Sequence, residues 1–141
     1  MGRGAIPTVR DAQIVAVMVA EPYKAVDVDT AVRAWLRDML NVPVFFGVNN
    51  DGDFPQIVVM RISGQDSQAR FQFDVWGGTR DQAAATAADL ASELSRCRFD
   101  TTDVRLHGAS WETTRWFPDP ETDRPRFIVE ALISATARTA L

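Results

Sequence analysis

A short stretch of strict alternation, followed by two glycines, constrains the fold of this chain more than any other feature. The run RFQFDVW carries aromatic or branched side chains at every second position: Phe71, Phe73 and Val75. Such a period of two predicts a β-strand with one buried face. Gly77-Gly78 then favours a tight turn, because glycine reaches backbone angles that other residues avoid.

The segment after the glycines has the spacing of a helix. Thr79 is a good N-cap, and Asp81 in the first turn favours the positive end of the helix dipole. The apolar side chains that follow form one helical stripe, which consists of Ala83, Ala87, Leu90, Ala91 and Leu94. We therefore expect a half-buried strand that turns directly into an alanine-rich helix lying close against the sheet.

A second helix is predicted earlier in the chain, over Asp27 to Leu40. Its apolar side chains recur at i, i+3, i+4 and i+7, namely Val32, Trp35, Leu36 and Met39. Residues 1–26 are predicted as an N-terminal arm or extension, and 27–141 as a single domain. Within the arm, 11–20 has the composition of a short helix or a strand, and periodicity does not decide between them; Glu21-Pro22 is expected to end it.

Four more segments read as strands. Gln56–Ser63 has β-branched residues on both faces, which indicates a central strand. The others are Val44–Phe46, Val104–Trp111 and a long closing strand, Arg126–Ala137. Between the last two, 111–123 is rich in Trp, Thr, Pro and acidic residues and is predicted as a long irregular loop. The fold class is α+β, with a mainly antiparallel four- to five-stranded sheet and two helices packed on one face.

Composition and charge argue against several classes of function. The chain has 141 residues, a net charge of −4 and a pI near 4.9, which argues against a nucleic-acid binder of the basic-patch kind. The N-terminus lacks the apolar core of a signal peptide. The apolar run Ile14–Ala20 is far shorter than the roughly 20 residues that cross a bilayer. We expect a soluble cytoplasmic or assembly-bound domain with no membrane contact.

Catalytic patterns are scarce. Cys97 and His107 are the only residues of their kinds, so a histidine-rich or multi-thiolate metal site cannot form. A Cys97–His107 nucleophile pair is formally possible, yet Cys97 follows a helix C-terminus, where the dipole disfavours a thiolate. The acidic turn Asn49–Asp53 lacks the glutamate of a calcium-binding EF-hand loop. We expect no enzyme activity, no metal and no cofactor.

Exposed aromatic and charged side chains are the more informative feature. Trp111, Trp116 and Phe117 surround a Pro-rich loop and either fold back on the sheet or contact a partner. The acidic residues of that loop either form a solvated loop or an acidic lip that faces DNA or a basic partner. Charges on the sheet face away from the helices are either hydrated or paired across subunits. The candidate interface residues are Arg70, Asp74, Trp76, Trp111, Trp116, Phe117, Arg126 and Glu130.

Three stretches together resemble a known family. They are PQIVVMRISG, ARFQFDVWGGTRDQAAATAADLASEL and WETTRWFPDPETDRPRFIVEALISATAR, which span Pro55 to Arg138. Their order and spacing are similar to those of the tail terminator proteins of long-tailed, siphovirus-type bacteriophages. The first 26 residues depart from that pattern, because they are longer than expected before the first helix.

The resemblance implies a structural function in the virion. Tail terminators form a ring, expected to be hexameric, on the head-proximal end of the tail tube, stop tube polymerisation and join the tail to the head connector. The implied partners are other copies of the chain, the tail tube protein, the connector or neck protein and the tape measure protein. DNA passes through the lumen without specific binding, and assembly takes place in the host cytoplasm. The alternatives are a neck or head-completion protein of the same virion, and a small-molecule-binding domain.

Overall fold

The structure is a computed structural model that describes residues 21–47 and 53–137, with side chains from residue 28 onward. The predictions for the arm over 1–20 and for the turn at 48–52 lie outside these ranges. None of the helices in the described part is long and apolar enough to cross a membrane.

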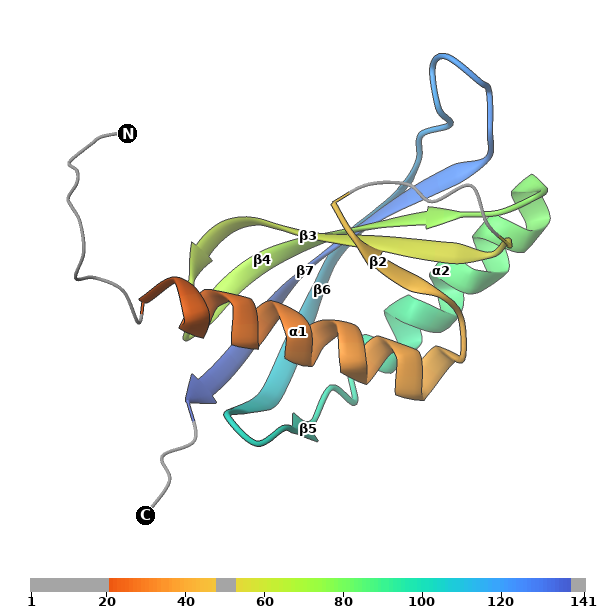
Figure 1. The fold of residues 1–141 in the computed structure, drawn as a ribbon. Helices are drawn as coiled ribbons and strands as arrows, with labels where there is room; N and C mark the ends of the chain where they lie inside the picture. The colour runs from red at the N-terminus through yellow and green to blue at the C-terminus, as the bar shows by residue number, and fades with distance from the viewer. Residues whose placement is uncertain (1–20, 48–52, 138–141) are drawn as a thin grey trace, which may run out of the picture.

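The described residues form a curled six-stranded sheet and two helices (Figure 1). The strand order is β2-β3-β4-β7-β6-β5. Every pairing is antiparallel except that of β2 with β3, which is parallel. The elements are α1 (Glu21–Leu40), β2 (Val44–Phe46), β3 (Gln56–Gln65), β4 (Gln68–Trp76), α2 (Arg80–Leu94), β5 (Phe99–Asp100), β6 (Val104–Trp116) and β7 (Arg126–Ala137).

One face of the sheet carries the core. Phe71, Phe73 and Val75 of β4 are fully buried, as the alternation predicts. They belong to one cluster with the apolar stripes of both helices, which confirms that α1 and α2 cover the same face. The sheet is mainly antiparallel, but the expected count of four to five strands is wrong, because the two-residue β5 adds a sixth.

Helix α1 begins six residues before the predicted start. Pro22 lies in its first turn, where a proline is tolerated because the first N–H groups of a helix have no internal partner. A proline read as a stop signal is therefore part of a helix start, and 21–26 is helix rather than arm. Val32, Trp35 and Leu36 are buried as predicted, but Met39 is 41% exposed.

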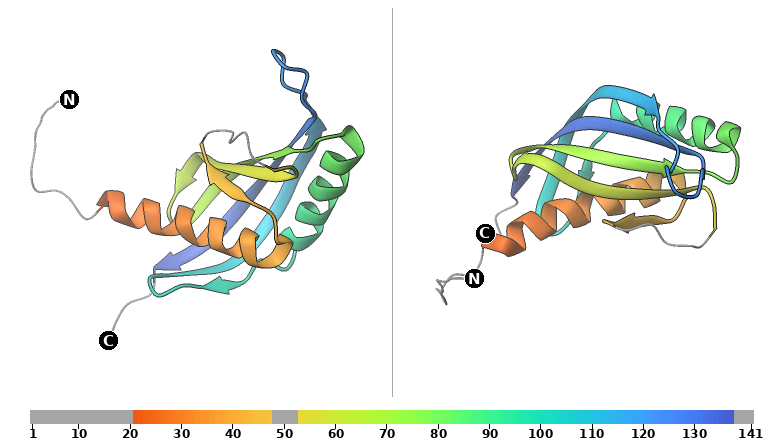
Figure 2. Two further views of the ribbon diagram at one scale, coloured as in Figure 1. Left: turned by 45° about the vertical axis from the view of Figure 1, so that its right-hand side comes forward. Right: turned by 90° about the horizontal axis from the view of Figure 1, so that it is seen from above.

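Strand β6 is longer than predicted and replaces most of the predicted loop. It runs to Trp116, and only 117–125 connects it to β7. Two register shifts in its pairing with β7, at His107 and Glu112, insert one extra residue each. These β-bulges break the period-two pattern, which explains why the sequence of this strand reads as irregular. The 117–125 connection projects beyond the rest of the molecule (Figure 2).

The turn between β4 and α2 is as the sequence predicts. Thr79 is the N-cap, and its Oγ1 accepts a hydrogen bond of 3.1 Å from the backbone N–H of Gln82. The Gln82 side chain accepts in return from the N–H of Gly78, at 2.6 Å. This reciprocal pattern resembles a capping box, in which the Thr79 and Gln82 side chains accept from backbone N–H groups at the N-terminal end of α2.

Candidate functional site

The sheet leaves two strand edges open, on opposite sides. On one side, β5 pairs with β6 only at Arg105 and Leu106, so β6 has no outer partner over 107–116 among the described residues. On the other side, β2 covers β3 only at 57–59, and 60–65 is left without an outer strand in the part of the chain that the structure describes. Open edges present unpaired backbone N–H and C=O groups, which can pair with another chain.

The open edge of β6 carries the exposed aromatic residues predicted from the sequence. Trp111 is 51% exposed, Phe117 45% and Trp116 37%. Trp116 packs partly on its own chain, because its ring lies 5.1 Å from that of Phe127 and under the Arg80 guanidinium at 4.6 Å. Trp111 makes one polar contact, a 2.9 Å hydrogen bond from its indole Nε1 to Thr114 Oγ1. It therefore offers the larger free apolar surface.

On the sheet face away from the helices, three arginines are paired with carboxylates of the same chain. Arg70 binds Glu112 through both oxygens at 2.6 and 2.9 Å, and this hydrogen bonding lowers the pKa of Glu112. Arg115 pairs with Glu130 at 3.1 Å. The third pair joins Arg126 and Asp74 at 3.4 Å. The charges predicted here are therefore matched within the subunit. The exposed pairs of Arg70 and Arg115 contribute little to stability, whereas the pair of Arg126 with Asp74 is mostly buried.

Arg126 brings four of the predicted residues together. Its guanidinium lies 4.8 Å from the Trp76 ring centre and 5.1 Å from that of Phe117, and its Nε donates to the Phe117 carbonyl at 2.8 Å. Beneath it, Trp76 is 4% and Asp74 6% exposed. These two side chains offer almost no free surface in the single chain. Through its contacts with Phe117, Arg126 instead holds the start of the 117–125 connection against the end of the sheet.

Replacing Arg126 by alanine is expected to lower the free energy of unfolding by about 2 kcal/mol. The substitution leaves the buried Asp74 carboxylate without its cation and uncovers the Trp76 ring. Denaturant unfolding followed by tryptophan fluorescence measures the change. Arg115→Ala, which breaks an exposed pair on the same face, serves as the control and should cost less than about 1 kcal/mol. Equal effects of the two substitutions would contradict this assignment.

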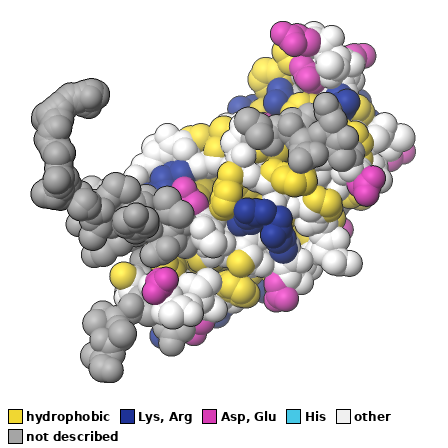
Figure 3. Space-filling view, viewed as in Figure 1, with side chains coloured by type: hydrophobic (Ala, Val, Ile, Leu, Met, Phe, Trp, Pro, Cys, Tyr) yellow, Lys and Arg dark blue, Asp and Glu magenta, His cyan; other side chains and the backbone are white. Residues whose placement is uncertain are grey.

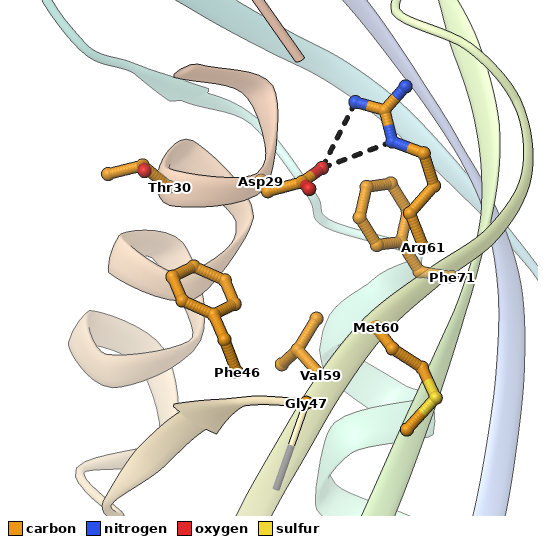
Figure 4. A pocket seen from close by; sticks show the side chains of 8 residues that line it. All are labelled: Asp29, Thr30, Phe46, Gly47, Val59, Met60, Arg61 and Phe71. Atoms are coloured by element: carbon orange, nitrogen blue, oxygen red, sulfur yellow. Dashed lines mark hydrogen bonds and ion pairs between the residues drawn. The ribbon is translucent and has the colours of Figure 1, made fainter. Parts of the chain in front are cut away.

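A pocket of about 320 Å³ opens between α1, the end of β2 and β3 (Figure 4). Its walls are mainly apolar, and Arg61 at one side binds Asp29 at 3.0 Å while its guanidinium lies 5.7 Å from the Phe71 ring centre. Burial raises the pKa of Asp29 despite that bond. The remaining lining residues are Thr30, Phe46, Gly47, Val59 and Met60.

Basic side chains lie beside this pocket. Arg33 and Arg37 both donate to the Val44 carbonyl, at 3.0 and 3.2 Å, and Arg33 lies 5.0 Å from the Phe46 ring centre. Figure 3 shows a group of basic side chains between α1 and β2, with hydrophobic side chains around it. Sequence reasoning missed this surface, since Phe46, which is 38% exposed, carries no pattern that separates it from a core residue.

In the structure, Cys97 and His107 do not form the nucleophile pair that the sequence formally allows. Cys97 is buried in the core, and burial raises its pKa to about 12, so it is a poor nucleophile at neutral pH. His107 is exposed on β6, with its Nε2 2.8 Å from Thr136 Oγ1. A shallow depression of about 430 Å³ contains His107 together with Arg98, Asp100 and Arg105, but not Cys97.

Comparison with known proteins finds similarity only at the level of solved structures. No family model matches the chain, and no curated protein matches it significantly. Among solved structures, the chain is similar to one described as "Structure of bacteriophage SPP1 gp17 protein", with 15% sequence identity and a TM-score of 0.45. The match covers 87% of this chain and 96% of that one. At this identity and TM-score, the similarity supports no conclusion about family or function.

Proposed function

We propose that this chain is a tail terminator of a long-tailed bacteriophage, a virion protein that forms a ring on the head-proximal end of the tail tube. In this role it stops tube polymerisation and joins the tail to the head connector. The motifs between Pro55 and Arg138 suggest the family. The observation that carries the ring is the pair of open edges on opposite sides of one sheet, on β6 and β3.

Two different edges are what a cyclic assembly needs. A ring closes through heterologous contacts, in which one patch of a subunit meets a different patch of the next. Strand β6 is antiparallel to β7, β7 to β4 and β4 to β3, so β6 and β3 run in opposite directions. A rotated copy can therefore add its β3 edge antiparallel to β6, and repetition of this step continues the sheet from subunit to subunit.

The sheet face without helices suits the lumen of such a ring. Its arginines are matched by Glu112, Glu130 and Asp74, so this face carries no excess of free positive charge at those positions. Phosphate binding by proteins depends on such positive charge. A charge-balanced wall lets DNA pass without holding it. The helices then lie on the outside of the ring, and the tube and the connector contact its two ends.

The test is the length of tails made without this protein. A phage in which the gene is interrupted by a stop codon should produce over-long tubes, visible by negative-stain electron microscopy, and no joined virions. Wild-type protein supplied from a plasmid should restore normal length, which controls for effects on neighbouring genes. Tails of normal length that fail to join heads would contradict this function and favour a neck protein. Normal infectious virions would exclude both functions.

A further inference from the structure

The exposed Trp111 and the pocket beside β3 lie on the same side of the sheet. Trp111 is paired in register with Ala131, and Arg61 of the pocket with Phe71; both of these partners are buried under the helices. Residues directly opposite each other in a sheet point to the same face. The aromatic side chain and the pocket thus occupy the helix-covered face, one at each open edge.

The open edge of β6 is long enough to cover that of β3. Among the described residues, β3 has no outer partner over 60–65, and β6 has none from residue 107 to its end at Trp116. If Trp111 of one subunit lies opposite Arg61 of the next, 107–112 runs along the whole of 60–65. The bulge at Glu112 then falls where β2 begins to cover β3, and a bulge bends its strand, so 113–116 can leave the line of β3 there.

The pocket suits an indole. Its volume of about 320 Å³ is at the small end of the roughly 300–1,000 Å³ range of ligand pockets, and a single large side chain fits it better than a bulky ligand. Phe46, Val59 and Phe71 supply apolar walls. Arg61 and Arg33 already lie over aromatic rings of these walls, and a guanidinium attracts the face of tryptophan more strongly than that of phenylalanine.

We propose that Trp111 of each subunit inserts into the pocket between α1, β2 and β3 of the neighbouring subunit, and so fixes the register of the ring contact. This inference rests on the proposed ring. The occupant is a second copy of this chain. Tryptophan in a desolvated pocket is a typical interface hot spot, so its removal should weaken the contact by roughly 30-fold or more.

Complementary substitutions test the contact. Trp111→Ala removes the inserted side chain, and Phe46→Glu places a carboxylate in the wall of the pocket. Both side chains are exposed, so we expect each variant to fold, which thermal unfolding followed by circular dichroism checks. Native mass spectrometry at rising protein concentration should show rings for the wild type and monomers for each variant alone.

Mixing the two variants gives the decisive result. A Trp111→Ala subunit keeps an intact pocket, and a Phe46→Glu subunit keeps an intact tryptophan, so one sound contact can form between them. We expect one-to-one dimers of two 15.6 kDa chains, without larger rings. Met39→Glu is the matched control, because Met39 is equally exposed near the end of α1 but does not line the pocket. It should form rings as the wild type does.

The contrary outcomes separate this inference from the proposed function. If Trp111→Ala still forms rings, the inference is overturned and the proposed function is not. If Phe46→Glu is monomeric in that case, the pocket has another occupant, such as a small molecule or a different segment. A mixture that stays monomeric would likewise overturn it. A wild-type chain that is monomeric at every concentration would overturn the insertion together with self-assembled rings, whereas the tail-length experiment still tests termination.

Discussion

Replacing Phe73 by alanine is expected to lower the free energy of unfolding by about 3–5 kcal/mol, the usual cost of truncating a buried phenylalanine. The ring is fully buried at the middle of β4, between Val59 of β3 and Val129 of β7. It also lies 6.4 Å from the Phe71 ring. The neighbours of a truncated core side chain relax only partially, so the loss of the ring is expected to leave a cavity. Urea unfolding at concentrations where the protein is monomeric measures the loss.

A phenylalanine of the same size outside the core provides the comparison. Phe46 is 38% exposed, so Phe46→Ala should cost about 1 kcal/mol or less. A Phe73→Ala protein with unchanged stability would show that β4 presents its other face to the helices. The prediction thus checks the orientation of the central strand as well as the quality of its packing.

The second large effect is expected for Gly77→Ala, at the turn between β4 and α2. A Cβ at this position would lie 2.6 Å from the backbone nitrogen of Ala83 and 2.7 Å from the Thr79 carbonyl oxygen. Both neighbours are backbone atoms of the first turn of α2, so they cannot move aside without shifting the helix. We expect a loss of about 3 kcal/mol, at the upper end of the usual cost of overpacking.

Gly78→Ala is the matched control, one residue further along. A Cβ there meets only the end of the Gln82 side chain, at 3.3 Å, and that side chain can rotate away. The thermal midpoints of the two variants, measured side by side, should therefore differ by several degrees. If both glycines tolerated alanine equally, the close approach of α2 to the sheet at Gly77 would be incorrect.

The parts of the fold that sequence reasoning predicted are those in which one local signal dominates. Around Phe73 the period of two is unbroken, and at Thr79 a capping residue directly follows the glycines. Both predictions are confirmed, by the buried face of β4 and by the N-cap hydrogen bond to Gln82. Signals of this kind need no knowledge of distant residues.

Other features depend on contacts between distant segments and were out of reach. The burial of Asp74 and Trp76 follows from Arg126, which is about 50 residues away in the chain. A strand pattern predicts only that these side chains face away from the helices. Similarly, the pocket at Phe46 exists because β2 is short and parallel to β3, which no local pattern specifies.

Of the predicted interface set, the structure leaves Trp111, Trp116 and Phe117 partly exposed and pairs the charged members within the subunit. Their role in assembly stays a prediction. The composition of this region suggested exposed aromatic side chains, but not which of the rings makes few contacts within its own chain. That distinction comes from Phe127 and Arg80, which hold Trp116 and leave Trp111 open.

The extra residue at Glu112 has an evolutionary consequence. Trp111 and Trp116 are five positions apart, an odd number, so in a regular strand their side chains would point to opposite faces of the sheet. The extra residue of the bulge places both side chains on the same face as Ala131 and Phe127. Loss of a single codon between them would therefore move one tryptophan from the helix-covered face of the sheet to the opposite face. Length changes in this stretch among descendants of the gene should occur in steps of two residues, because an odd step would exchange the partners that each ring reaches.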